Sequence, residues 1–220
     1  EADAELRVVR ELARKDLAAR KYVSAGANIN KAFNLEPGLK EGEWGAREKR
    51  LAVVMAGLKL GKIPAREQLL SRETEQSNSG AEAIAAYIEG KDLKAFLLAH
   101  TALGADLRGD AMFEELLYLI SDLVRIPVRR DEILPKEALI KEKLRKAASG
   151  FYIKQFDVAA RECEEVAVLD EKNPVAWTRL GSAYFMLGDK DKAKKAYQKA
   201  LELNPGDLIT GKFMDAQGWR

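Results

Sequence analysis

One stretch of the chain, residues 173–205, limits what the rest can fold into. It contains two expected helices, each with its apolar residues at three- and four-residue intervals on one face: Trp177, Leu180, Gly181, Tyr184, Ala193, Tyr197 and Ala200. Gly188 separates the helices because glycine tolerates the left-handed conformation that ends a helix, and Asn204-Pro205-Gly206 ends the second one. Two short amphipathic helices cannot bury their apolar faces alone, so this hairpin is expected to pack against neighbours.

The order Trp, Leu-Gly, Tyr, then Ala, aromatic, Ala and Pro in this stretch resembles the tetratricopeptide repeat, a helix-turn-helix unit of about 34 residues. Tyr197 stands where that repeat usually has Phe. The resemblance implies an all-α solenoid of helix-turn-helix repeats, wound as a right-handed superhelix. It also implies a non-catalytic scaffold that binds other proteins.

Weaker copies of the repeat precede the strong one. Counting back by the period of about 34 residues places Ala147, Ala159 and Cys163 at the positions of Gly181, Ala193 and Tyr197. Near the N-terminus, Pro37 precedes Pro205 by 168 residues, close to five such periods. In the middle, Gly90 precedes Ala95 as Gly188 precedes Ala193. The sequence therefore predicts degenerate repeats through the middle of the chain.

The expected organisation has five parts. They are an N-terminal helical region with one degenerate repeat (1–71), a polar loop (72–80), degenerate helical repeats (81–135), two repeats (136–205), and a capping helix or start of a further repeat (206–220). Within the first part, a short helix is expected from Ile63-Pro64 to about Ser71, and residues 71–80 are the candidate joint between sub-domains. Within the third, the apolar helix 110–125 is expected to be buried on more than one side, and 126–135 to be an extended connection.

Composition excludes several function classes. With 37 basic and 35 acidic residues the net charge is +2, so no global field favours nucleic acid, and the expected partner is a protein or peptide. One cysteine and one histidine argue against a disulfide framework and a multi-ligand metal site, and we expect no cofactor. No apolar run approaches the roughly 20 residues that cross a bilayer, so direct membrane insertion is not expected.

The compartment stays open between cytoplasm and periplasm for a chain expected to be soluble. Its start lacks the basic-then-apolar pattern of a signal peptide, and it opens on Glu1 rather than Met. This opening is expected of a processed chain or of an excised fragment.

The resemblance also implies where a partner binds, because the first helix of each repeat lines the concave groove of such an array. The residues expected in this groove are Lys141, Leu144, Arg145, Val175, Thr178, Arg179, Ser182 and Phe185. Lys141, Arg145 and Arg179 are expected to form a basic track for a carboxylate. Lys141 and Arg145 resemble the basic pair of the carboxylate-clamp members, but Ser182 and Ala148 replace the clamp's Asn residues, which argues against that specialised activity. The alternative is an ordinary solvated helix face.

Other chemistry-bearing residues favour structural interpretations. The lysines between 190 and 199 lack interleaved aromatic residues and fit a solvated face better than a nucleic-acid site. His100 has no second His or Cys nearby, and Cys163 occupies a packing position. No catalytic constellation is present. The alternative function is a structural protein that self-assembles, or docks within a longer chain, through the ends of the solenoid.

Overall fold

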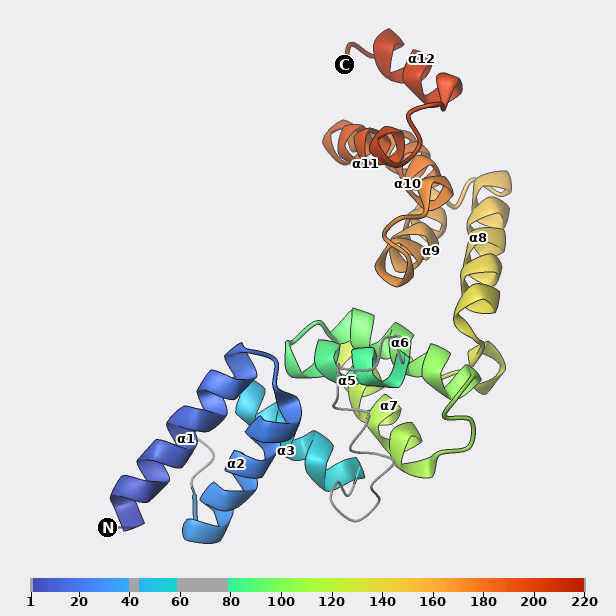
Figure 1. Cartoon of the computed structure of the whole chain (residues 1–220). Helices are drawn as coiled ribbons and strands as arrows, with labels where there is room; N and C mark the ends of the chain where they lie inside the picture. The colour runs from blue at the N-terminus through green and yellow to red at the C-terminus, as the bar shows by residue number, and fades with distance from the viewer. Residues whose placement is uncertain (1, 40–43, 59–78, 220) are drawn as a thin grey trace. The chain divides into compact units, whose positions relative to one another are not determined.

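A computed structural model of the chain describes residues 2–39, 44–58 and 79–219, and all regular structure within these ranges is helical (Figure 1). This confirms the predicted all-α fold of helix-turn-helix repeats. The first helices are α1 (Ala2–Ala18), α2 (Tyr22–Leu35), α3 (Ala46–Leu58), α5 (Ser79–Ile88), α6 (Asp92–Gly104), α7 (Ala111–Val124) and the 3₁₀ helix η3 (Arg130–Glu132). They are followed by α8 (Lys136–Tyr152), α9 (Phe156–Leu169), α10 (Pro174–Met186), α11 (Lys190–Leu203) and α12 (Leu208–Ala216).

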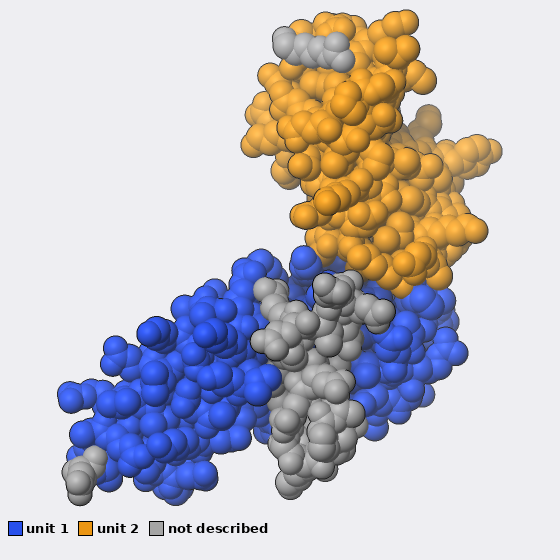
Figure 2. All heavy atoms as spheres, in the orientation of Figure 1, with its two compact units in different colours: residues 1–135 blue, residues 136–220 orange. Residues whose placement is uncertain are grey.

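The chain forms two compact units, residues 1–135 and 136–220 (Figure 2). The division falls between Pro135 and Lys136, where α8 begins, and not in the polar segment 71–80. Ser79 and Gly80, which the sequence places in that polar segment, are the first residues of α5. Residues 71–78 and the short helix expected from Ile63 lie outside the described residues.

The same turn joins the two helices of four hairpins: α1–α2, α5–α6, α8–α9 and α10–α11. In each turn one residue has a left-handed backbone conformation, with φ between 59° and 84°: Arg20, Gly90, Lys154 and Gly188. The next residue's N–H then donates to the carbonyl five residues back, at 2.8–2.9 Å in all four turns. These bonds satisfy carbonyls that the end of a helix leaves unpaired. The four hairpins therefore share one turn geometry.

Side-chain caps fix where the last three helices, α10, α11 and α12, begin. The side chain of Asn173 accepts a hydrogen bond from the N–H of Ala176 at the start of α10. Asp189 does the same at the start of α11, and Asp207 at the start of α12. Such caps satisfy free N–H groups of the first helical turn and contribute about 1 kcal/mol each. Asn173 and Asp207 are one repeat apart, so α12 starts where the first helix of another repeat would start.

In residues 1–135 the core lies around α5 and α6. Every residue of α6 from Ala95 to Gly104 is buried. The expectation that α7 is buried on more than one side is wrong. Its residues Tyr118, Leu119 and Leu123 are 46%, 38% and 48% exposed, and Phe113, Leu116, Leu117, Ile120 and Ser121 form its single buried face. By contrast, α6 mixes large and small side chains, and its burial on every face gives it the central place in this unit.

The connection after α7 is extended only in part, because η3 interrupts it. Its last residues lie against the end of α6. A Cβ added to Gly104 would be 2.2 Å from the carbonyl carbon of Leu134 and 2.6 Å from the nitrogen of Pro135. Gly104 allows the chain to pass this closely. The predicted extended connection is correct on both sides of η3, where Arg129 and Ile133 have extended backbone conformations.

Polar contacts hold α3 within residues 1–135. Glu48 is buried and accepts a hydrogen bond from Arg14 Nε of α1 at 2.8 Å. On the same helix Arg50 forms an ion pair with Asp92 of α6, and its guanidinium lies 4.8 Å from the ring centre of Tyr87. These partly buried pairs fix the position of α3 between the two hairpins of this unit.

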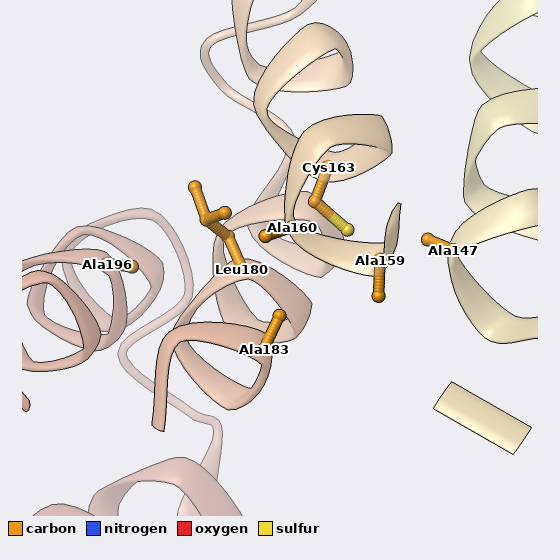
Figure 3. Packing of buried hydrophobic residues seen from close by; sticks show 7 residues of the cluster. All are labelled: Ala147, Ala159, Ala160, Cys163, Leu180, Ala183 and Ala196. Atoms are coloured by element: carbon orange, nitrogen blue, oxygen red, sulfur yellow. The ribbon is translucent and has the colours of Figure 1, made fainter. Parts of the chain in front are cut away.

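The core of residues 136–220 is built mainly from small side chains (Figure 3). Its buried cluster consists of Ala147, Ala159, Ala160, Cys163, Leu180, Ala183 and Ala196, from helices α8 to α11. Small residues at these places let helix backbones approach closely, as a stack of hairpins requires. Cys163 is fully buried, as its place in the repeat predicts.

Candidate functional site

A regular stripe of residues runs along the first helix of each repeat in residues 136–220. On α8 it contains Lys141, Leu144, Ala148 and Tyr152, and on α10 it contains Val175, Thr178, Ser182 and Met186. On α12 it contains Ile209, Lys212 and Ala216. The spacing of three and four residues places each set on one face of its helix. We call these three sets the inner stripe.

Contacts bring the helices of the inner stripe together. Arg179 Nη1 of α10 donates to the carbonyl oxygen of Leu144 in α8 at 2.8 Å. Between α10 and α12, the ring of Phe185 lies edge-on to Phe213, with centroids 5.1 Å apart, and 6.1 Å from Trp219. The three first helices are therefore joined directly, in addition to their packing against α9 and α11.

The eight residues expected in the groove differ in exposure. Lys141, Arg145 and Val175 are exposed, and the other five, Leu144, Thr178, Arg179, Ser182 and Phe185, are half-buried. Ser182 and Phe185 also have internal roles. The Ser182 hydroxyl donates to the carbonyl of Thr178 and lies 2.9 Å from the hydroxyl of Tyr197, which links α10 to α11. Phe185 supports α12 through its ring contacts.

Two of the three residues of the expected basic track already have partners within the protein. Arg145 is bound by the neighbouring Glu142, with its Nε 2.8 Å and its Nη2 2.6 Å from the two carboxylate oxygens. This hydrogen-bonded pair raises the pKa of Arg145 and lowers that of Glu142. Arg179 is turned toward α8, where it holds the Leu144 carbonyl. Lys141 remains exposed at the start of the inner stripe.

Sequence reasoning missed two pairs of exposed apolar residues at the ends of the first helices. Tyr152 and Ile153 are 90% and 57% exposed, and Met186 and Leu187, one repeat later, are 55% and 49% exposed. Tyr152 and Met186 belong to the inner stripe. The sequence does place large apolar residues just before each turn. From the sequence alone, however, such a residue could equally cover the core or face the solvent.

Charged residues within the α8–α9 pair are buried and paired. Lys143 stands where the strong repeat has Trp177, and its ammonium forms ion pairs with Glu162, at 3.4 Å, and with Glu165. The Tyr184 hydroxyl donates to Glu164 of α9, and burial together with this carboxylate raises the pKa of Tyr184. Removing one member of such a buried set leaves an uncompensated charge, so these residues have a structural role.

The described residues contain no group of three or more His, Cys, Asp or Glu side chains arranged to hold a metal ion. His100 is buried in α6, with its ring 4.5 Å from that of Phe96. Burial raises the pKa of the Cys163 thiol to about 11, which disfavours the reactive thiolate. Within the same residues, no helix is both long enough and apolar enough to span a bilayer.

Comparison with known proteins identifies the repeat. Residues 174–207 match the family model of the tetratricopeptide repeat. The chain is 36% identical over 63 residues to human RNA polymerase II-associated protein 3, covering 29% of this chain and 10% of that protein. It is 33% identical over 70 residues to human Superkiller complex protein 3, and 31% over 70 residues to Tetratricopeptide repeat protein 37 of Xenopus laevis. These last two matches each cover 32% of this chain and 4% of the relative.

The match, the four equivalent turns and the stacked hairpins agree with one another. The chain contains a tetratricopeptide repeat, which the family model matches at residues 174–207. The chain spans a tenth or less of the length of the curated relatives given above.

Proposed function

We propose that this protein is a non-catalytic scaffold that holds a segment of another protein in a concave groove. The groove is lined by the inner stripe, with Arg145, Arg179 and Phe185 beside it. The observation that carries the proposal is the inner stripe itself, which repeats at equivalent places on α8, α10 and α12 and presents exposed side chains on each helix. The names of two relatives, a polymerase-associated protein and a complex protein, are consistent with a role in protein assemblies.

The test is selection of peptides from a random displayed library on the intact chain. Ala148 is an exposed residue in the middle of the stripe on α8, so Ala148→Arg places a long side chain in the groove without entering the core. The selected peptides are expected to bind this variant at least tenfold more weakly. Ala56→Arg, at an exposed alanine of α3, is the matched control and should change nothing. If no selected peptide responds to Ala148→Arg, the groove assignment is wrong.

A second candidate function, self-assembly through the helix faces at the ends of the repeats, rests on a different observation. Val8 and Leu12 of α1 are 55% and 43% exposed, whereas Ala176 and Leu180, at the equivalent places of α10, are buried, Leu180 in a cluster with residues of α9. At the other end Leu208 is 72% exposed. A second copy that covered these residues would make the mass depend on concentration.

Light scattering across a concentration range, on the parent and on Leu12→Ser and Leu208→Ser variants, tests self-assembly. Point substitutions are better than deletion of residues 206–220, because deletion would remove Phe213 and Trp219 and expose the rings of Phe185 and Tyr197 that pack against them. A monomeric parent at every concentration would remove this second candidate for the chain studied.

A further inference from the structure

We infer that the segment held in the groove is recognised through large apolar side chains, with an acidic residue beside them. This inference rests on the proposed function and deepens it by naming the chemistry of the partner. It departs from the carboxylate recognition that the basic residues of the sequence suggest. Exposure, charge and repeat spacing support it separately.

Exposure shows where the stripe has apolar surface to offer. Tyr152 and Met186 end the stripe on α8 and α10 with 90% and 55% of their surface exposed. Val175 and Ile209 begin it on α10 and α12 with 47% and 84% exposed. Both edges of the stripe therefore carry large apolar side chains that the protein itself leaves uncovered. Exposed apolar side chains that recur at equivalent places of successive repeats favour an interaction site.

The affinity expected from covering these apolar side chains is larger than the affinity expected from ion pairs with the exposed cations. Covering a large apolar side chain strengthens binding roughly 10- to 100-fold, whereas an exposed ion pair contributes less than about fivefold. Arg145 is already bound by Glu142 and Arg179 by the Leu144 carbonyl. A carboxylate would have to displace Glu142 to bind the Nε–Nη2 edge of Arg145, and Arg179 offers it only the donors that are not bound to Leu144.

The positive charge of the inner stripe indicates that the partner also carries an acidic residue. The inner stripe contains two exposed lysines, Lys141 and Lys212, and its residues include no carboxylate. An acidic residue that flanks the apolar side chains complements this charge, and it would speed association more than it would strengthen the complex. A basic apolar segment would be disfavoured by the same two lysines.

The repeat also sets the spacing of the apolar side chains in the partner. Tyr152 and Met186 occupy the same place on successive first helices, which Arg179 joins. Packed helices lie about 8–10 Å apart, and an extended chain advances about 3.3 Å per residue. At that helix spacing, apolar residues three apart in an extended segment are expected to meet these two side chains.

The peptides selected from the random library test this inference. We expect them to share two large apolar residues three positions apart with Asp or Glu nearby. A synthetic peptide of that consensus should lose about tenfold in affinity with Tyr152→Ser and with Met186→Ser, and about threefold with Lys141→Glu. Val53→Ser, at a 43% exposed valine of α3, is the matched control and should have no effect. Circular dichroism would verify that each variant keeps its helices.

The outcomes separate the two proposals. Selected peptides that respond to Ala148→Arg but are acidic and lack the apolar pair would overturn the inference and leave the scaffold function standing. The same holds if the consensus peptide binds Tyr152→Ser and Met186→Ser as tightly as the parent. Sedimentation with anionic phospholipid vesicles that is abolished by Tyr152→Ser would assign the apolar edge to a membrane surface and overturn it too. Absence of any peptide that responds to Ala148→Arg would overturn both.

Discussion

Gly181 lies so close to Tyr197 that a Cβ added to it would be 2.8 Å from the tyrosine ring. This contact joins the two helices of the strong repeat. The same two places in the other hairpins are occupied by Ala147 and Cys163, Ala83 and Ala99, and Ala13 and Ile29, all of them buried. Tyr197 is the largest of the four residues at the second-helix place, and it faces a glycine. The smaller residues at that place, Cys163, Ala99 and Ile29, each face an alanine.

We predict that Gly181→Ala destabilises residues 136–220 by about 1–2 kcal/mol, because overpacking against the ring outweighs the gain of up to about 1 kcal/mol in helix propensity. Tyr197→Cys should cost about 3 kcal/mol through the cavity it leaves. The double variant reproduces the type of pair found in the preceding repeat, so it should cost about 1 kcal/mol less than the sum. Urea denaturation of the four proteins measures this, and strict additivity would contradict the steric account.

Much of the fold was predictable because the repeat imposes the same spacing several times. The hairpins around Gly90 and Gly188 follow from glycine at the turn and from helical periodicity. Arg20 and Lys154 adopt the same left-handed turn without glycine, so local propensity does not indicate it, and alignment to the strong repeat is needed. The place of α6 at the centre was also not predictable, because burial on all sides depends on neighbours distant in sequence.

Gly104 gives a second steric prediction. Its missing side chain faces the backbone of Leu134 and Pro135, which cannot rotate away as the end of a side chain can. We predict that Gly104→Ala destabilises residues 1–135 by about 3 kcal/mol, at the upper end of overpacking effects. Gly57 of α3 has nothing within 4 Å of an added Cβ, so Gly57→Ala should stabilise by up to about 1 kcal/mol. Thermal unfolding followed by circular dichroism compares the two, and equal effects would contradict the close approach at Gly104.

The lone cysteine gives a prediction about reactivity. Cys163 is fully buried and burial raises its pKa to about 11, so the native thiol should react with a disulfide reagent at pH 8 at least 100-fold more slowly than the urea-unfolded chain. The absorbance of the released thiolate follows the reaction. Fast reaction of the folded protein would mean that α9 opens readily, or that the thiol is accessible.

The site was less predictable than the fold. Spacing identified the helix face that carries Lys141, Val175 and Ser182, because the face follows from helical geometry. Spacing did not predict which charged side chains are already paired within the protein. Glu142 lies three residues before Arg145, which permits an ion pair, but the bond from Arg179 to the Leu144 carbonyl depends on how α10 packs on α8. Side-chain partners of this kind are fixed by tertiary packing rather than by local sequence.

Glu89 gives a pH-dependent prediction. It accepts a hydrogen bond from the Tyr22 hydroxyl at 3.0 Å and an ion pair from Arg20 at 2.9 Å, which tie the α1–α2 hairpin to the end of α5. Burial alone would raise the pKa of Glu89, but the hydrogen bonds from Tyr22 and Lys91 and the charge of Arg20 outweigh it and lower the pKa below its ordinary value of 4.5. A carboxylate with a lowered pKa in the folded state stabilises the protein above its unfolded pKa, and this contribution is lost as the pH falls through the folded pKa.

We therefore expect Glu89→Gln to destabilise residues 1–135 by about 2 kcal/mol at pH 7, as for other hydrogen bonds to charged groups. The difference from the parent should shrink below about pH 4.5, because the parent then loses the same charge. Urea denaturation followed by Trp44 fluorescence, in a Trp177→Phe and Trp219→Phe background, reports on this unit. Glu11→Gln, at an exposed residue of α1, should change stability by less than about 0.5 kcal/mol at either pH. A Glu89→Gln effect that stays constant from pH 7 to pH 3 would show that the carboxylate charge does not hold the two hairpins together.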